Sequence, residues 1–214
     1  DVEFNYFFAN ILPFVWYLCT MKILILVATE NEILRENFSD CSILIGGVGM
    51  INTTYELTNY LSKNSADFVI NLGIAGSFKK DLVVGTVCEV INDTFSELGV
   101  ENKEEFLTLN QVGFNTKNAF MANSRTSLIN VSSITVNTVH GNKKSISNIS
   151  QRLNPGIETM EGAACMMVCE KFNIPCLQIR SISNFIEERN KENWDIPLAV
   201  KNLNSIAREI ISNL

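Results

Sequence analysis

Continuous aliphatic runs alternate with amphipathic stretches along most of this chain, and that alternation limits the possible folds. Residues 23–28 form an unbroken aliphatic run, as in a strand that is buried on both faces of a sheet. Strands that alternate with helices indicate an α/β fold with a largely parallel sheet. Further strands are predicted over 42–45, 68–71, 83–92, 133–139 and 176–182, and helices over 51–61, 146–153, 161–172 and 196–213, with a short helix ending near 38 and a polar, irregular stretch over 93–130.

Length and charge narrow the class of partner. The 214 residues fit one α/β domain, and a hydrophobic share of 46% provides a sizeable core. The net charge is −6 and the sequence pI is about 4.9. Phosphate contacts need clustered Lys and Arg, so we expect no nucleic-acid partner. The chain also lacks a basic patch for an anionic membrane surface, so we expect no membrane partner.

The six cysteines show no CxxC pair. Cys165 and Cys169 are one helical turn apart, but no second Cys/His pair completes a zinc site. We therefore expect them to fill an apolar core, with no metal and no cofactor. Scattered free thiols fit a reducing compartment, so the expected location is the cytoplasm.

The first twenty residues differ from the rest. They are apolar and rich in aromatic side chains, whereas Met21-Lys22 looks like a natural start. The run contains Asn and Pro, has no basic region and is short for a membrane span. We expect residues 1–20 to be an extension or expression-derived segment and residues 21–214 to be a single domain. A truncated signal or membrane anchor is the alternative.

Acidic, glycine and amide residues follow the predicted strands. Glu32 follows the first strand, Gly49 the second, Gly73–Gly76 the third, and Asn184 the last. Ligands of open α/β sheets bind beyond the carboxyl ends of the strands, so these residues predict a site there. Of Glu30 and Glu32, one is expected to be an ordinary helix-start acid and the other a general base.

Two glutamates precede an apolar helical run over 163–169. Glu158 and Glu161 are three residues apart, which predicts that they share one helical face. They are either solvated first-turn acids favoured by the helix dipole or functional groups held at a cost in desolvation. His140 is the only histidine, and a loop position or a ligand contact are both open for it.

Two glycine motifs need separate interpretations. Gly46-Gly47-Val48-Gly49 is not a dinucleotide fingerprint, because the spacing differs from GxGxxG and the motif follows the second strand. Gly73-Ile74-Ala75-Gly76 predicts a tight turn, which is either a plain strand-to-loop turn or one whose backbone N–H groups approach a ligand.

Five motifs in order resemble the nucleoside phosphorylase / methylthioadenosine nucleosidase superfamily. The resemblance covers 21–214 and implies a three-layer fold, with a mixed, largely parallel sheet flanked by helices. Details over 93–99, 135–141, 158–162 and 180–185 look most like the futalosine hydrolase family. The five motifs are Met21–Glu32, Gly47–Met50, Asn71–Gly76, Thr159–Ala164 and Arg180–Asn184.

The resemblance implies hydrolysis of an N-glycosidic bond in a small nucleoside. Glu32 matches the carboxylate that activates water, Glu161 matches the one that accepts both ribose hydroxyls, and Met160 packs on the sugar. A homodimer or larger assembly is also implied, in which a neighbouring subunit edges the site near 93–106. The resemblance assigns further substrate contacts to Ile74, Gly76, Val139, His140 and Thr159.

Asn184 departs from the pattern of nucleosidases for 6-amino purines, which carry Asp there. An amide cannot protonate N7 of the leaving base but can donate a hydrogen bond to N7 or O6. We therefore expect a 6-oxo purine, as in futalosine. A methylthioadenosine, S-adenosylhomocysteine or aminodeoxyfutalosine nucleosidase is the alternative.

Two other functions compete. Phosphorolysis needs cationic ligands, and Asn71-Leu72 stands where the family's phosphorylases have Arg. A nucleoside-binding protein without turnover would need neither Glu32 nor Glu161, so the presence of both favours an enzyme.

Overall fold

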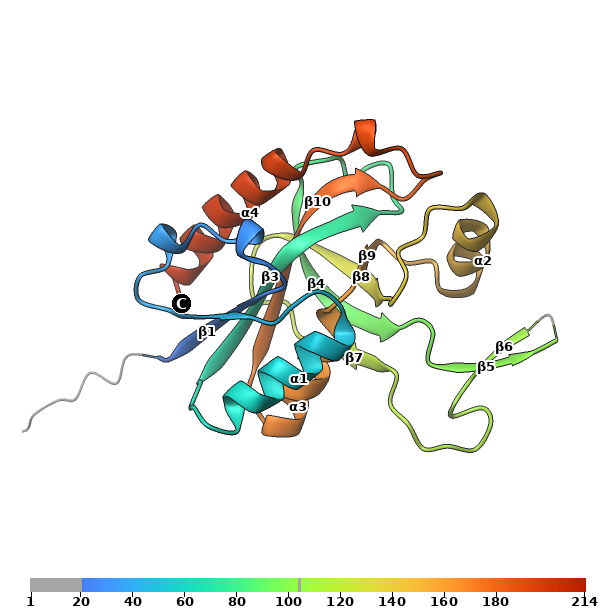
Figure 1. Ribbon diagram of the computed structural model, residues 1–214, viewed down its shortest axis with the longest axis horizontal. Coiled ribbons are helices and arrows are strands. Elements are labelled where there is room, and N and C mark those ends of the chain that lie inside the picture. Colours follow the sequence, from blue (N-terminus) through green and yellow to red (C-terminus); the bar gives the residue numbers. More distant parts are fainter. Residues whose placement is uncertain (1–20, 104) are drawn as a thin grey trace, which may run out of the picture.

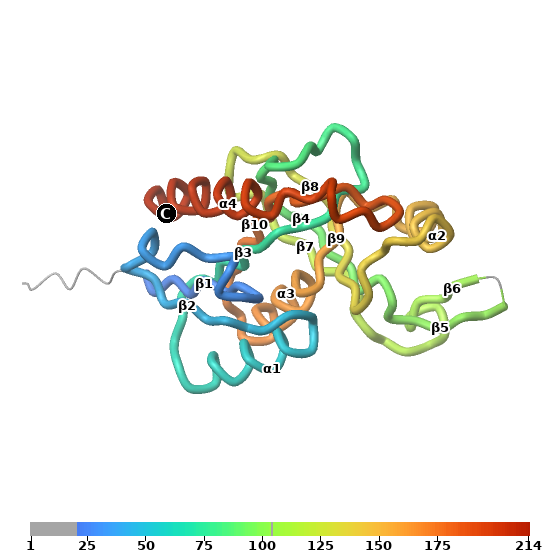
Figure 2. The backbone as a smooth tube through the Cα atoms, turned by 45° about the horizontal axis from the view of Figure 1, so that its top comes forward, coloured from blue at the N-terminus to red at the C-terminus, as the bar shows by residue number. Residues whose placement is uncertain are grey.

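A central mixed sheet lies between helices on both faces (Figure 1). The computed structural model describes residues 21–103 and 105–214. Helix α4 covers one face of the sheet, whereas α1 and α3 lie together on the other face (Figures 1 and 2). This three-layer α/β arrangement confirms the predicted fold class. The predictions about residues 1–20 lie outside the described residues.

The element bounds agree with the sequence pattern at most strands and helices. The strands are β1 (Ile23–Val27), β2 (Ser42–Ile45), β3 (Phe68–Ser77), β4 (Val87–Phe95), β5 (Gly99–Asn102), β6 (Glu105–Thr108), β7 (Ala119–Met121), β8 (Ile129–Thr135), β9 (Ile157–Thr159) and β10 (Cys176–Phe185). The helices are α1 (Met50–Leu61), α2 (Lys143–Leu153), α3 (Gly162–Phe172) and α4 (Ile196–Ile211), with short 3-10 turns η1 (Glu30–Glu32), η2 (Arg35–Asn37) and η3 (Lys191–Asn193).

Strand β3 is the centre of the sheet. It pairs in parallel with β1 and β10 and in antiparallel fashion with β9. Strand β2 extends the sheet in parallel beyond β1, and β4 joins β10 in antiparallel fashion and β8 in parallel. Parallel pairs therefore predominate, as expected from strands joined by helical connections.

Alternate residues of β1 fill the cores on the two faces. Ile25 packs into the cluster that contains Leu203 of α4. Leu24 packs into the opposite cluster with Leu57 of α1 and Cys165 of α3. Because a strand directs successive side chains to opposite faces, an unbroken aliphatic run serves both layers. Cys165 is fully buried there, as predicted for a core-filling thiol.

The predicted turn over Gly73–Gly76 is wrong, because this stretch continues as strand. Strand β3 runs to Ser77 and pairs with β10, with Gly73 opposite Arg180. A Cβ atom on Gly73 would lie 2.5 Å from Nη1 of Arg180, and one on Gly76 would lie 2.3 Å from Cδ1 of Ile186. The glycines make room for neighbouring side chains rather than turning the chain.

Glu158 is not on a helix, so the prediction of a helical face shared with Glu161 is wrong. Glu158 lies in β9, opposite Gly76 of β3 and Ile134 of β8. Helix α3 begins only at Gly162, and Glu161 is its N-cap residue. The strand persists through Thr159 because its carbonyl accepts the N–H of Val136 at 3.0 Å.

The stretch 93–130, expected to be irregular, holds several strands. Strand β4 extends to Phe95, and β5 and β6 form an antiparallel pair that projects from the main sheet (Figure 1). Strand β8 covers 129–135 rather than 133–139. These strands contain polar residues, which made the stretch look like a loop. Asp93 and Thr135 are nevertheless buried, because they form a hydrogen bond with each other at 2.9 Å. Within the described ranges, no helix is long and apolar enough to cross a membrane.

Candidate active site

Glu161 stands at the start of α3 and faces the loop after β2. Its Oε1 accepts a hydrogen bond from the backbone N–H of Gly49 at 2.9 Å. Gly49 has φ +92°, a conformation that favours glycine, so the loop can present its N–H there. Burial raises the pKa of the Glu161 carboxyl, whereas the positive charge of Arg180 and the Gly49 N–H lower it. The residue is therefore not the solvated acid of the alternative interpretation.

Glu32 ends the 3-10 turn after β1 and links this turn to β3. Its Oε2 accepts the backbone N–H of Thr29 at 3.0 Å, and its Oε1 accepts the N–H of Ile74 on β3 at 3.3 Å. The amide of Asn204 on α4 donates to the Glu32 carbonyl at 2.9 Å. Glu30 instead forms an ion pair with Arg35 at 2.7 Å, in which both side chains are exposed. Only Glu32 thus points toward the strand ends.

Arg180 lies beside both carboxylates. Its side chain is buried, and Nη2 donates to Oδ1 of Asn71. A Cβ atom on Gly73 would lie 2.5 Å from Nη1 of Arg180 and 3.2 Å from Oε1 of Glu32. The side chains of Arg180 and Glu32 therefore both approach the backbone of Gly73. The charges of Arg180 and Glu32 also act on Glu161 in opposite directions. These three side chains form one electrostatic cluster.

The sequence motifs contained Arg180 without identifying it as a site residue. A guanidinium within an otherwise buried strand is costly unless it is paired, and that cost is the signal that could have found it.

A buried network of hydrogen bonds holds the first turn of α3 in place. Asp93 accepts hydrogen bonds from Oγ1 of Thr135 at 2.9 Å and from Nε2 of Gln178 at 3.0 Å. The Thr135 hydroxyl in turn accepts the N–H of Ala163 at 2.8 Å. Burial raises the pKa of Asp93 to about 6, opposed by the hydrogen bonds from Gln178 and Thr135. The network fixes the helix terminus that carries Glu161.

Asn184 lies in a second group of predicted residues, around a small cavity. Its Nδ2 donates to the carbonyl of Phe185 at 2.9 Å, and Ser183 Oγ donates to its Oδ1 at 2.8 Å. Because the Phe185 carbonyl takes one of the two amide hydrogens, the other is available to a ligand. Gly76, Val139, His140 and Asn184 line the cavity.

The cavity volume is about 50 Å³, well below that of a typical ligand pocket. The side chain of Ile186 reduces it by packing over Gly76. Entry of a purine base would therefore require Ile186 to move.

Met160 and Thr159 lie between the two groups along the chain. Met160 is half-buried and packs, like Phe78, on the apolar cluster of Ile134 and Val136. The hydroxyl of Thr159 accepts the N–H of Gly162 at 3.3 Å, which gives it a structural contact at the helix start. Substrate binding by either residue stays a prediction.

A larger cavity lies beside the carboxylate cluster rather than on it. Its volume is about 800 Å³, and its walls are mostly apolar. Met50 at its edge directly follows Gly49, the residue that bonds Glu161. Its other apolar walls come from α1, α3, the end of β4 and the loop after β4, namely Ile51, Tyr55, Phe95, Leu98 and Met167.

The sequence profile described as the phosphorylase superfamily matches residues 33–212. The chain belongs to the phosphorylase superfamily. The resemblance drawn from the five motifs is thereby confirmed. The described residues contain no group of three or more His, Cys, Asp or Glu side chains that could hold a metal ion.

Individual members of the phosphorylase superfamily are distant relatives. A futalosine hydrolase from Streptomyces coelicolor is 27% identical over 139 residues, which cover 61% of this chain and 59% of that protein. A 5′-methylthioadenosine/S-adenosylhomocysteine nucleosidase from Marinomonas sp. is 27% identical over 181 residues, covering 78% of this chain and 77% of that protein. The native structure of a Helicobacter pylori futalosine hydrolase matches with a TM-score of 0.79 at 19% identity, covering 91% of this chain and 98% of that one, which shows the shared fold.

Proposed function

We propose that this protein hydrolyses the N-glycosidic bond of a purine nucleoside. The observation that supports this most directly is that Glu32 and Glu161 lie near each other and near the buried guanidinium of Arg180, so that the charges of Glu32 and Arg180 both act on Glu161. Cleavage of the bond develops positive charge on the sugar, and fixed carboxylates bind that transition state better than the neutral substrate. The matched relatives of the superfamily named above include two kinds of hydrolytic nucleosidase, in agreement with this chemistry.

The two carboxylates would have different roles in the reaction. Glu32 keeps its oxygens oriented through Thr29 and Ile74, so it can take a proton from an attacking water. Glu161 accepts the N–H of Gly49 through Oε1, and its carboxylate has further lone pairs that can accept the ribose hydroxyls. In this assignment Glu32 is the general base and Glu161 is the sugar ligand and counter-charge.

Water rather than phosphate is the proposed acceptor. A phosphate dianion needs several cationic or N–H donors. Arg180 already donates to Asn71 and lies beside Glu32 and Glu161. A phosphate placed there would meet two carboxylates and a partly occupied guanidinium, which disfavours phosphorolysis.

We propose a 6-oxo purine as the leaving base and futalosine as the substrate. Asn184 offers an amide hydrogen to N7 or O6 but has no proton to give up. Hypoxanthine leaves more readily as an anion than adenine, so it depends less on an acid. The nucleosidase relative that covers more of the chain supports the second candidate, a 5′-methylthioadenosine/S-adenosylhomocysteine nucleosidase.

The non-purine tail of such a substrate would extend toward the larger cavity. That cavity adjoins the Gly49 loop and has room for a drug-sized group, at about 800 Å³. Ile51 and Tyr55 on its α1 wall are 76% and 67% exposed. We propose that a second copy of the chain covers this wall, giving the predicted homodimer or larger assembly.

Release of hypoxanthine from futalosine and from inosine, coupled to xanthine oxidase, tests the function. We expect turnover of futalosine that does not change when phosphate is added, and unphosphorylated dehypoxanthinyl futalosine as the second product. Methylthioadenosine, followed by adenine release, is the comparison substrate. Turnover that requires phosphate would establish a phosphorylase, and faster turnover of methylthioadenosine would establish the second candidate.

A further inference from the structure

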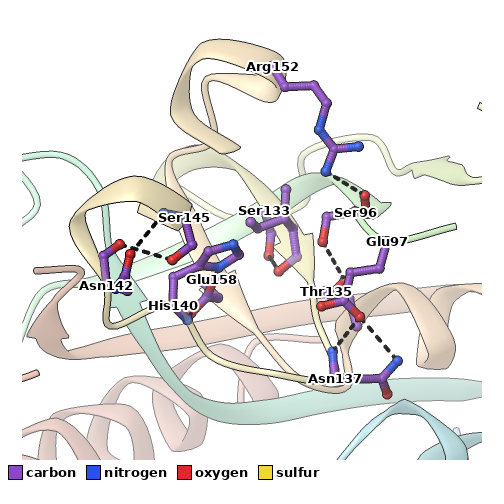
Figure 3. A network of polar contacts seen from close by, with 11 residues as sticks. Ser96, Glu97, Ser133, Thr135, Asn137, His140, Asn142, Ser145, Arg152 and Glu158 are labelled. Carbon is purple, nitrogen blue, oxygen red and sulfur yellow. Dashed lines mark hydrogen bonds and ion pairs between the residues drawn. The ribbon is translucent and has the colours of Figure 1, made fainter. Parts of the chain in front are cut away.

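A buried glutamate and the only histidine of the chain form a pair that the proposed mechanism does not use. The Glu158 side chain is 1% exposed and the His140 side chain 14% exposed. Oε1 of Glu158 accepts the backbone N–H of His140 at 2.9 Å, and Oε2 bonds to ring nitrogen Nδ1 (Figure 3). A buried carboxylate is costly, and here both of its oxygens are committed to one residue.

The sheet places this pair opposite Asn184. Glu158 and Asn184 both lie next to Gly76 in the register, one on β9 and the other on β10. Glu158, His140 and Asn184 line the same cavity. An edge of the purine that reaches Asn184 would therefore also face His140.

The contacts of Glu158 determine which ring nitrogen of His140 is free. An ionised carboxylate only accepts hydrogen bonds, so Nδ1 must carry the ring proton of the neutral imidazole. Nδ1 therefore donates to Glu158, and Nε2 is left as the acceptor of a ring that lines the cavity. This tautomer follows from the hydrogen-bond partners.

We propose that His140, fixed by Glu158 as an acceptor at Nε2, reads the N1–H of a 6-oxo purine. Hypoxanthine carries a hydrogen on N1, whereas N1 of adenine is an acceptor and would face Nε2 with no hydrogen between them. The inference rests on the proposed function for its substrate class. Together with Asn184, it makes two side chains select the 6-oxo base, with Glu158 as the positioning residue.

Glu158→Gln tests the inference, because it should shift the base preference in one direction, from hypoxanthine toward adenine. The backbone N–H of His140 needs an acceptor, which holds the oxygen of the new amide in place and turns its NH₂ group toward Nδ1. Nδ1 then becomes the acceptor and Nε2 the donor. The variant keeps the shape of the site and reverses the hydrogen-bonding character of His140.

The readout is binding of the free bases hypoxanthine and adenine by calorimetry at pH 8, where imidazole is ordinarily neutral. We expect the wild-type preference for hypoxanthine to shift toward adenine by roughly 10- to 100-fold in Glu158→Gln, the range for one mispaired buried hydrogen bond. Glu188→Gln is the matched control, because Glu188 pairs with Lys143 in solvent at 2.8 Å and is not among the residues that line the cavity. That control should stay within about twofold of wild type.

His140→Phe is the second variant, because an aromatic ring retains the packing against Phe78. It should lose most of the preference by weakening hypoxanthine binding. An unchanged ratio in both variants would overturn the inference. Base binding is measured without turnover, so a protein that discriminates the bases but releases none from nucleosides would refute the proposed function and leave this inference standing.

Discussion

Asp93→Asn is expected to change how the stability of the protein depends on pH. Asp93 is fully buried, and burial raises the pKa of its carboxyl to about 6. In the unfolded chain an aspartate titrates near 4. The folded state therefore binds this proton more readily, and ionised Asp93 destabilises the fold above pH 6. Stability from this group is gained as the pH falls through 6 and is complete near 4.

The size of the effect follows from the shift. A difference of about two pKa units corresponds to about 3 kcal/mol in the free energy of unfolding. The amide of the variant can keep the hydrogen bond from Thr135 as an acceptor. Nε2 of Gln178 donates to Asp93 in the wild type, so the Gln178 amide must turn over in the variant. The new NH₂ group can then donate to Oε1 of Gln178, a buried atom that has no partner within the described residues. Asp93→Asn should thus be more stable than wild type at pH 8, by up to about 3 kcal/mol.

Urea unfolding of both proteins between pH 4 and pH 8 measures this difference directly. Other titrating groups are common to both, so they cancel when the two curves are subtracted. The difference should fall from its maximum at pH 8 to near zero at pH 4. Asp81→Asn, at an exposed aspartate, is the control and should give a flat difference near zero. A flat difference for Asp93→Asn as well would refute the reasoning.

Three further substitutions test the site. Glu161→Ala should lower kcat/KM for ribonucleosides far more than for 2′-deoxy substrates, since the acceptor of the ribose hydroxyls is lost, and equal losses would contradict that role. Asn184→Asp should shift the kcat/KM ratio toward 6-amino substrates by restoring an acid, so an unmoved ratio would show that Asn184 does not read the base. Gly162→Ala would put a Cβ 2.1 Å from Oδ2 of Asp93. Thermal unfolding should therefore show a free energy of unfolding lower by roughly 1–3 kcal/mol, and the activity should fall. Wild-type stability and activity would contradict a role of the buried network in positioning Glu161.

Features set by short stretches of sequence were predictable. The aliphatic run of β1 and the amphipathic pattern of α4 lie where the periodicity indicated. Glu32 bonds Thr29, three residues away, so its position depends mainly on the local turn. Glu161 likewise stands at a helix start that the apolar run after it defines.

Contacts between distant segments could not be predicted in the same way. The registers that bring Arg180 to Gly73 and Asn184 to Gly76 arise between strands more than a hundred residues apart in the chain. A polar residue such as Asp93 looked like a loop residue because its partner Thr135 lies 42 positions away. Glu158 looked like a helix acid, but pairing with β3 and β8 places it in strand β9. Contacts between distant segments determine the position of each of these residues, and the periodicity of a single sequence contains no information about such contacts.

Single-turnover hydrolysis by Glu32→Gln tests the central claim most directly. The amide keeps the volume of Glu32 and can still accept the N–H of Ile74, but it cannot take a proton from water. Glu30→Gln is the matched control two residues away, at a carboxylate that pairs with Arg35 in solvent. We predict a fall of about 10² to 10⁴ in the rate for Glu32→Gln, with substrate affinity largely kept. Glu30→Gln should react at nearly the wild-type rate. A wild-type rate in Glu32→Gln would contradict the assignment of Glu32 as the base that activates water.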